Sequence, residues 1–450
     1  MINWRKPIID IALRLDGYQT FRYLRFLKSV EFSSIEQLQR LQNEKLERLL
    51  LHTYENVPYY HRVLPEADVI ANNKVFLENF HKIPPLTKAI IRSEGENLYS
   101  DDYKKRGGYF NTSGGSTGEP VKFIQDKHSC AWGFAGRFLF NSWAGKDVGQ
   151  TELKLWGSER DVLEGKDELK TLLRRWLFNI ELLNTYRMSP DGMREHIDRW
   201  NELKPRQVWA YTDSMYKLSQ FVENEKISVY PPGSIICTTA PLLPQARKHI
   251  EQTFRCKVFD QYGSREVGPV ACECPAQEGL HIFTPIQRVE ILDSNDQPVK
   301  GEDIGRIVIT NLHNYSMPLI RYKIGDTGCF SNKPCSCGRG FPLLKEISGR
   351  VFAHFVKKDG SLVHSQFFVA LFFFKPWVKE FKVVQKHCDL IDISVALADK
   401  ADQNDIDVIT DKIKQVMDAD CRVEFKFVDE IPPTASGKYL YTFSEVPTTL

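Results

Sequence analysis

Strand-like and helix-like patterns alternate along the middle of this 450-residue chain. Residues 208–211 and 234–239 are short apolar runs typical of buried strands, residues 243–254 follow with helical periodicity, and residues 257–260 form another strand-like run. Strands separated by helices usually pair in parallel, because the chain crosses back over the sheet between them. The pattern therefore predicts an α/β fold with a substantial parallel sheet.

A helix is predicted over residues 34–52, ahead of this region. Ser34 is a suitable N-cap, Gln37 stands three residues later as the second member of a capping box, and leucines recur at helical spacing. Downstream, residues 281–292 and 305–310 are strand-like. We therefore expect further strands beyond the α/β region.

A smaller α+β unit is predicted near the C-terminus. Its expected elements are strands at 381–384 and 390–397, a periodic helix at 402–417 and a final strand at 422–428. The predicted fold class is α/β, with a large N-terminal α/β domain containing subdomains (residues 1–349) and a small mobile C-terminal α+β lid domain (residues 350–450).

The bulk composition excludes some classes of protein. The net charge of +2 gives no strong electrostatic case for nucleic acid as the main ligand. The longest apolar candidate, residues 367–374, is far shorter than the 18 or so residues of a transmembrane helix and is expected to be a buried strand or core helix. Arg5 and Asp10 leave no room for a signal-peptide core.

These features predict a cytoplasmic protein without a transmembrane segment. Residues 1–27 mix basic and apolar side chains, which suits either an ordinary docking helix or a peripheral contact with a membrane surface. The ten cysteines, in a large chain without a signal peptide, are expected to be reduced, as core thiols, metal ligands or catalytic groups.

Residues 112–120 form a loop rich in glycines and hydroxyl groups. Glycines let the backbone approach a ligand closely, while hydroxyls and backbone N–H groups can surround phosphate oxygens. Glu119 and Pro120 follow Gly118, so the Lys-Ser/Thr pair of a kinase-type P-loop is missing, and the dinucleotide fingerprint is absent here too. By composition alone, a surface turn is as good an interpretation as a nucleotide loop.

Four further motifs follow this loop along the chain. They are Tyr262-Gly263-Ser264-Arg265-Glu266, Arg321-Tyr322-Lys323-Ile324-Gly325-Asp326, Gly349-Arg350, and Pro432-Pro433-Thr434-Ala435-Ser436-Gly437-Lys438. All five motifs in this order resemble the adenylate-forming superfamily of acyl-CoA synthetases, luciferases and adenylation domains, over residues 45–445. The chain is most similar to the phenylacetate–CoA ligase-like branch, which includes CapK-like proteins of capsule biosynthesis. Residues 51–60 and the Cys-x-Cys-Gly-Arg sequence at 335–339 favour that branch.

The resemblance implies an ATP site built from several segments. The β- and γ-phosphates would be held by Ser113, Gly114, Gly115, Ser116, Thr117 and Gly118. The adenine would lie against Thr239, Ala240 and Pro241 and stack on Tyr262, which is followed by Gly263. Ser264 would lie near the α-phosphate, Asp326 would accept both ribose hydroxyls, and Arg350 would contact ribose or phosphate.

Two residues are implied to act in the reaction itself. Glu266 matches the acid that coordinates Mg²⁺, a hard cation that prefers carboxylate oxygens. Lys438 matches the mobile lysine of the small domain, which stabilises the negative charge that shifts between the substrate carboxylate and the α-phosphate. Taken singly, Glu266 could be a solvated loop acid, Asp326 a turn residue and Lys438 a surface lysine; their order along the chain favours a nucleotide site.

Two Cys-x-Cys pairs, at 272–274 and 335–337, can place thiolates around a tetrahedral Zn²⁺. In the resembled branch, one cysteine and a histidine join the later pair. The implied structural zinc ligands are Cys274, His281, Cys335 and Cys337, with Cys272 as the alternative to His281. Buried reduced thiols without a metal are the other interpretation.

Three positions depart from the family pattern. Glu119 replaces the lysine usual after the last loop glycine, and Ala240 stands where the family often has glutamate. The hinge acid usual after Arg350 is missing, because residues 351–354 read Val-Phe-Ala-His. Loss of the hinge acid is not expected to affect adenylation. It does put in doubt the second half-reaction, in which CoA would be the acceptor.

Residues 156–161 and 209–215 are expected to line the pocket for the carboxylic acid. Arg160, Asp161 and Tyr211, together with Asp213, make this pocket more polar than a phenyl-binding site requires. Aromatic residues such as those at 156 and 209 are also frequent in protein cores.

Three functions stay open. The first is ATP-dependent activation of a small-molecule carboxylic acid as an acyl-adenylate, with release of pyrophosphate and transfer to CoA. The second is an amide-forming ligase that passes the acyl group to an amino acid or amino sugar in surface-polysaccharide biosynthesis. The third is a non-catalytic nucleotide-binding relative, which the joint presence of Glu266, Asp326 and Lys438 argues against.

Overall fold

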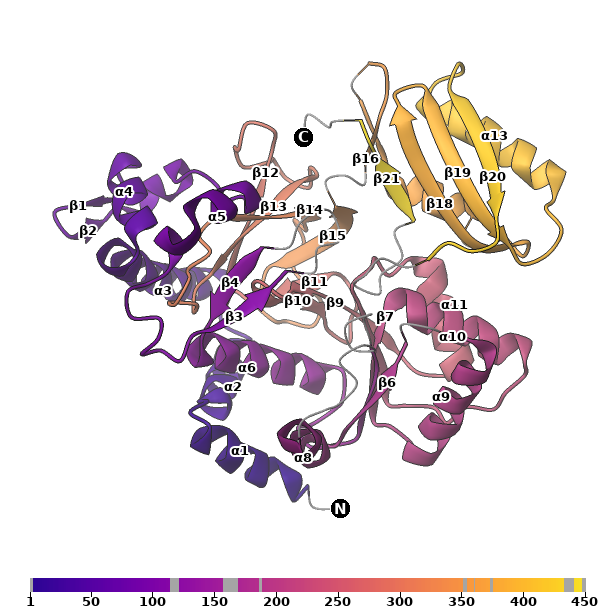
Figure 1. Ribbon diagram of the computed structural model, residues 1–450. Coiled ribbons are helices and arrows are strands. Elements are labelled where there is room, and N and C mark those ends of the chain that lie inside the picture. Colours follow the sequence, from indigo (N-terminus) through magenta and orange to yellow (C-terminus); the bar gives the residue numbers. More distant parts are fainter. Residues whose placement is uncertain are drawn as a thin grey trace.

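The structure is a computed structural model (Figure 1) that describes residues 3–113, 121–156, 169–185, 188–350, 354–359, 361–372, 375–432 and 441–446. Its helices are α1 (Arg5–Leu15), α2 (Thr20–Val30), α3 (Ile35–Asn56), α4 (Pro58–Glu66), α5 (Lys88–Glu94), α6 (Lys127–Trp143), α8 (Leu169–Phe178), α9 (Pro190–Leu203), α10 (Thr212–Asn224), α11 (Pro244–Phe254), α12 (Ser365–Phe372) and α13 (Gln403–Met417).

The strands are β1 (Ile70–Ala71), β2 (Lys74–Val75), β3 (Tyr109–Thr112), β4 (Lys122–Gln125), β5 (Glu152–Trp156), β6 (Ile180–Asn184), β7 (Gln207–Tyr211), β8 (Ser234–Thr238), β9 (Val258–Ser264), β10 (Gly268–Glu273), β11 (Leu280–Ile282), β12 (Gln287–Leu292), β13 (Gly305–Asn311), β14 (Tyr322–Phe330), β15 (Leu343–Arg350), β16 (His354–Val356), β17 (Leu362–His364), β18 (Val378–His387), β19 (Leu390–Leu397), β20 (Arg422–Val428) and β21 (Thr442–Ser444).

One large sheet runs through the first 350 residues. In the described part of the chain its strand order is β12-β13-β14-β15-β11-β10-β9-β8-β7-β5-β6. The strands from β6 to β9 pair in parallel, and those from β9 to β12 pair antiparallel. The predicted α/β fold with a parallel sheet is therefore confirmed.

The central parallel strands are buried on both faces. Every residue of β7 and β8 is buried. On one face Trp209 and Ile236 pack with α1, α2 and α6, and on the other Val208 and Ile235 pack with α9, α10 and α11. Two covered faces explain why these strands are continuous apolar runs in the sequence.

The helix predicted over residues 34–52 is confirmed as α3. The Ser34 side chain accepts a hydrogen bond from the Gln37 backbone at 3.3 Å, and the Ser34 backbone N–H donates to Gln37 Oε1 at 3.0 Å. This is the predicted capping box. The helix continues to Asn56, and Val57, which precedes Pro58, has extended backbone angles.

The prediction of a single strand over residues 281–292 is wrong. The chain instead forms β11, leaves the sheet through a turn, and re-enters as β12 at a distant place in the strand order. Pro285 lies in the turn and has no backbone N–H for a sheet. The backbone N–H groups of Ile286 and Gln287 both donate to the Phe283 carbonyl, which closes the turn.

The C-terminal unit has its own sheet and core. Its strand order is β20-β19-β18-β21, and α13 buries Ile409, Ile413 and Met417 against it. The apolar run at residues 367–374 was expected to be a buried strand or a core helix. Its described part belongs to the helix α12, which spans residues 365–372. In Figure 1 this unit lies apart from the large sheet. The division of the chain between residues 349 and 350 stays a prediction, although β15 ends at Arg350 and β16 begins at His354.

The N-terminal helix α1 docks on the protein through its buried residues Ile9 and Leu13. Its opposite side leaves Ile11 and Leu15 exposed. A contact with a membrane surface stays a prediction. No helix in the described ranges is both long and apolar enough to span a bilayer.

Gly340 is where the loop before β15 touches the connection between α2 and α3. Its N–H donates to the Glu31 carbonyl at 3.0 Å, and a Cβ atom there would lie 1.8 Å from the Ser33 carbonyl oxygen. We expect Gly340→Ala to reduce stability by about 2–3 kcal/mol, because backbone must move to admit the methyl group. Thermal unfolding would measure the loss.

Gly338→Ala is the matched control. Gly338 has a φ of 78° but open space around it, so alanine there should cost only about 1 kcal/mol of backbone strain. Equal losses for the two variants would show that the contact with Ser33 is not a constraint.

Candidate functional site

A cavity of about 1490 Å³ lies at the carboxyl ends of the parallel strands. Trp156 and Tyr211 are the last residues of β5 and β7, and Thr239 follows β8 directly; all three line the cavity. Both faces of the sheet are covered by helices, so the ends of the strands remain as the open edge. Open α/β sheets commonly bind ligands at this edge.

Tyr262 and Asp326 meet in this cavity although 64 residues separate them. The Tyr262 hydroxyl on β9 donates to Asp326 Oδ2 on β14 at 2.8 Å. Asp326 also stands opposite Arg350 in the register of β14 and β15. The fold thus brings together the backbones of three residues predicted to hold adenine and ribose.

The segment of Thr239, Ala240 and Pro241 lines the same cavity. The Thr212 hydroxyl contacts the carbonyl oxygens of Thr238 and Ala240 at 3.2 and 2.9 Å. Thr239 has a φ of 78°, which is unfavourable for a β-branched residue and tends to occur where function requires it. The segment is therefore anchored by α10 in an unusual backbone conformation.

The turn between β9 and β10 carries Ser264 and Glu266 into the cavity. Gly263 is required here, because a Cβ atom would lie 2.5 Å from the Gly268 carbonyl oxygen. Glu266 is 7% exposed, and its Oε1 atom lies 3.5 Å from the Tyr322 hydroxyl. A buried carboxylate that lines a cavity suits a cation ligand.

The predicted phosphate loop is described only at its start. The backbone N–H of Ser113 donates to the Val121 carbonyl at 3.0 Å, and the Val121 N–H donates to Ser113 Oγ at 2.9 Å. The loop between them is thus closed at its base. The structure does not describe Gly114, Gly115, Ser116, Thr117, Gly118, Arg160, Asp161, Lys438 or the Arg350 side chain.

Sequence reasoning missed Asp260, Arg247 and Glu273, which also line the cavity. Arg247 donates to both carboxylate oxygens of Glu273, at 2.7 and 2.9 Å, and the Asp260 N–H donates to Glu273 at 2.8 Å. Burial, together with the nearby Glu273 charge, raises the pKa of Asp260 to about 7. The sequence offered one indication that Asp260 lies near the site, because it stands two residues before Tyr262.

Arg321, by contrast, belongs to the Arg-Tyr-Lys motif but does not line the cavity. Its side chain is 1% exposed and pairs with Glu290 at 3.1 Å. It also donates to the backbone carbonyls of His81 and Ile83. Arg321 therefore ties the N-terminal region to the large sheet.

The predicted acid pocket opens from the same cavity. Trp156, Trp209, Tyr211 and Asp213 all line it. The rings of Trp156 and Tyr211 lie 4.3 Å apart, and Trp209 Nε1 donates to Asn141 Oδ1 at 3.2 Å. An aromatic wall therefore adjoins the segments predicted to bind the nucleotide.

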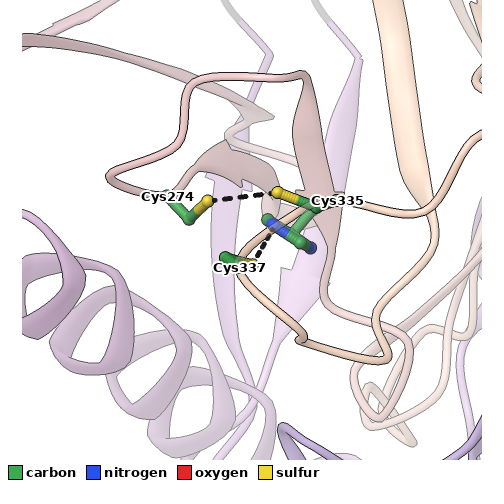
Figure 2. Close-up of side chains that lie close together, drawn as sticks. Cys274, Cys335 and Cys337 are labelled. Carbon is green, nitrogen blue, oxygen red and sulfur yellow. Dashed lines mark hydrogen bonds between the residues drawn. The ribbon is translucent and has the colours of Figure 1, made fainter.

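A second cluster consists of Cys274, His281, Cys335 and Cys337. One potential ligand atom from each lies within 4.8 Å of all the others. The sulfur atoms of Cys274 and Cys335 are 3.6 Å apart, and Cys337 Sγ lies 3.4 Å from His281 Nε2. Figure 2 shows the Cys274 and Cys335 thiols pointing toward one another, with Cys337 beside them.

The donors of this cluster suit a tetrahedral metal site. His281 Nδ1 lies 3.1 Å from the Phe341 carbonyl, an interaction that leaves Nε2 for the cluster. Burial lowers the pKa of His281 to about 4, so the imidazole is neutral, as a ligand must be. Of the two alternatives for the fourth ligand, the fold brings in His281, and Cys272 is not in the group of described residues whose ligand atoms lie together.

Comparison with known proteins gives a match to a family model and similarities to curated proteins and solved structures. The family model described as the CapK C-terminal domain matches residues 355–445. Protein CapK of Staphylococcus aureus is 23% identical over 416 residues, covering 90% of this chain and 89% of its own length. Phenylacetate-coenzyme A ligase of Thermus thermophilus is 24% identical over 347 residues, which are 70% of this chain and 71% of the ligase.

Among solved structures, 2-hydroxyisobutyryl-CoA ligase in the postadenylation state superposes with a TM-score of 0.71. The two sequences are 18% identical, and the superposition covers 92% of this chain and 91% of the ligase chain. This likeness confirms the predicted fold class, a large N-terminal α/β domain with a small C-terminal domain. Together, the similarities confirm that the chain is related to the phenylacetate–CoA ligase-like branch of the adenylate-forming superfamily, which includes CapK.

Proposed function

We propose that the protein uses ATP and Mg²⁺ to convert a carboxylic acid into an acyl-adenylate, with release of pyrophosphate. The observation that carries this proposal is the single cavity that Tyr262, Asp326 and Glu266 share with an aromatic pocket. An aromatic ring and two carboxylates are the groups needed to hold a nucleoside and its metal-bound phosphates.

In the proposed reaction, a carboxylate oxygen of the acid attacks the α-phosphorus and pyrophosphate leaves. The Tyr262 ring stacks on adenine, and Asp326, held by the Tyr262 hydroxyl, accepts hydrogen bonds from the ribose hydroxyls. Glu266 would hold the Mg²⁺, which would balance phosphate charge. Lys438 would approach from the small domain and stabilise the charge that develops between the two substrates.

We propose CoA as the first acceptor to test and an amine as the second. CoA is favoured because phenylacetate-coenzyme A ligases recur among the relatives. An amino acid or amino sugar is favoured by the missing hinge acid after Arg350 and by the similarity to CapK. The second acceptor would fit a role in surface-polysaccharide biosynthesis.

We also propose that Cys274, His281, Cys335 and Cys337 bind a structural Zn²⁺. Four protein ligands fill a tetrahedral zinc site and leave no position for a substrate. The ligands come from the turn after β10, from β11, and from the loop before β15. A metal there would crosslink segments about 60 residues apart in the chain, and would stabilise the middle of the large sheet.

The acyl-adenylate proposal predicts ATP–pyrophosphate exchange that depends on a carboxylic acid. Lys438→Ala should reduce the exchange rate by about 10²-fold or more, because one stabilising charge is lost. Lys426→Ala is the matched control: Lys426 is an exposed lysine of the same small domain, paired with Asp392 at 2.6 Å. Absence of exchange with every acid, together with a Lys438→Ala variant that behaves like the parent, would refute the enzymatic interpretation.

The acceptor can be assigned separately. We expect the pre-formed acyl-adenylate complex to yield a thioester when CoA is added, and mass spectrometry would identify the product. Amino acids and amino sugars would be supplied in parallel reactions. Formation of an amide, with no thioester, would reject CoA and favour the second acceptor class.

The metal proposal predicts about one zinc ion per chain in the purified protein, measured by elemental analysis. Removal by a chelator should lower the thermal melting point, because the metal would crosslink distant segments only in the folded protein. Cys335→Ser should lose the metal, whereas Cys272→Ser and the distant Cys388→Ser should retain it. An unchanged melting point and no bound metal would rule out the zinc site.

A further inference from the structure

Three cationic side chains surround one buried carboxylate in the acid pocket. Glu152 is 1% exposed; Arg137 pairs with its Oε1 atom, and Lys146 lies 2.5 Å from its Oε2 atom. Lys154 Nζ lies 4.0 Å from Glu152 Oε1. All four residues line the cavity. A single carboxylate therefore faces three positive charges.

The strand pattern explains why this charge faces the cavity. Glu152, Lys154 and Trp156 alternate along β5 and thus point to one face of the sheet. Leu153 and Leu155, between them, pack into the core on the opposite face. The cations are therefore presented beside an aromatic wall, which also includes Trp209 beneath the Arg137 guanidinium at 4.7 Å.

Helix α8 adds Arg174 and Arg175 to the same part of the cavity. The Arg174 guanidinium lies 5.3 Å from the centre of the Phe134 ring. Among the described lining residues of α6, α8, α10, strands β5 to β7 and the loop before β5, the acids are Glu152 and Asp213. In the part of the chain that the structure describes, five cationic side chains thus face two carboxylates in this part of the cavity.

Two of these cations have unused capacity to donate hydrogen bonds. Arg137 Nε is buried and has no hydrogen-bond partner among the described residues. Lys154 Nζ is too far from Glu152 for a hydrogen bond and makes none with another described residue. Both cations thus share the single Glu152 carboxylate as their counter-charge. Burial and the nearby Arg137 lower the pKa of Lys154 to about 7, because together they outweigh Glu152, which raises it.

We propose that the acid bound in this pocket carries a second anionic group, a distal carboxylate or phosphate, which binds between Arg137 and Lys154. The inference rests on the proposed acyl-adenylate function and narrows its substrate class. The aromatic side chains Trp156 and Trp209 would cover the carbon body of the substrate. A site for a purely apolar acid has no use for excess positive charge, since a neutral side chain would fill the same space at lower cost.

The test compares matched acids in ATP–pyrophosphate exchange. Adipate would be compared with hexanoate, 1,4-phenylenediacetate with phenylacetate, and 3-phosphoglycerate with glycerate. In at least one pair we expect kcat/KM to be about tenfold or more higher for the acid with the second anion, because charge-assisted hydrogen bonds discriminate by at least this factor. The phosphate pair separates phosphate from carboxylate as the distal group.

The outcomes distinguish the two proposals. Exchange in which no pair favours the acid with the second anion would overturn this inference and leave the acyl-adenylate function standing. Exchange with no acid would contradict the proposed function and, with it, the substrate class.

Lys154→Gln tests the residue itself. This variant should raise KM for the preferred anionic acid by about tenfold, with kcat and the KM of the monoanionic partner little changed. Lys154→Arg should restore the lower KM. Lys82→Gln is the surface control, since Lys82 is exposed and pairs with Asp68. A melting point equal to that of the parent would confirm that the variants are folded, and an unchanged substrate preference in Lys154→Gln would reject the role of Lys154.

The dependence on pH supplies a second measurement. An anion beside Lys154 favours its protonated form, so binding should take up a proton near pH 7 and KM for the anionic acid should rise as pH increases through this range. The charged groups around Lys154 are Glu152, Arg137, Lys146 and Arg175. Lys154→Arg should abolish the dependence, because arginine stays protonated. Persistence of the same profile in that variant would assign the titration to another group.

Discussion

Burial of the parallel strands on both faces is the constraint on which the rest of this structure depends. β7 and β8 lie between the helices α1, α2 and α6 on one side and α9 to α11 on the other. With both faces occupied, the carboxyl ends of the strands are the place where polar side chains can gather. Trp156, Tyr211 and Thr239 meet there because their strands run in the same direction.

The two parts of the cavity differ in charge. Glu266 and Asp326 lie in one part, beside Tyr262, and suit a metal-bound nucleotide. Arg137 and Lys154 lie in the other part and suit an anion. The Mg²⁺ that accompanies the nucleotide would thus balance the carboxylates of the first part, and the anionic acid would balance the cations of the second part.

Local signals predicted much of the fold, and long-range pairing explains the failures. The capping box of α3 depends on residues three apart, and both members behave as predicted. The prediction of one strand over residues 281–292 was wrong because hydrophobic pattern alone does not reveal that the chain leaves the sheet after Ile282 and re-enters it at Gln287. The cationic cluster around Glu152 was not predicted, because its members share no motif and come from a helix, a loop and a strand.

The sequence by itself determined the types of chemistry available: the ordered motifs around Tyr262, Asp326 and Lys438, and the two Cys-x-Cys pairs. These motifs can be identified without a structure, because each consists of residues that are neighbours in the sequence. The tertiary structure decided which groups meet. Pairing of β10 with β11 and of β11 with β15 brings His281, rather than Cys272, to the thiols of Cys274, Cys335 and Cys337. Likewise, the position of β5 beside β7 turns scattered basic residues into one charged pocket, because sheet register and packing, not spacing along the chain, set these distances.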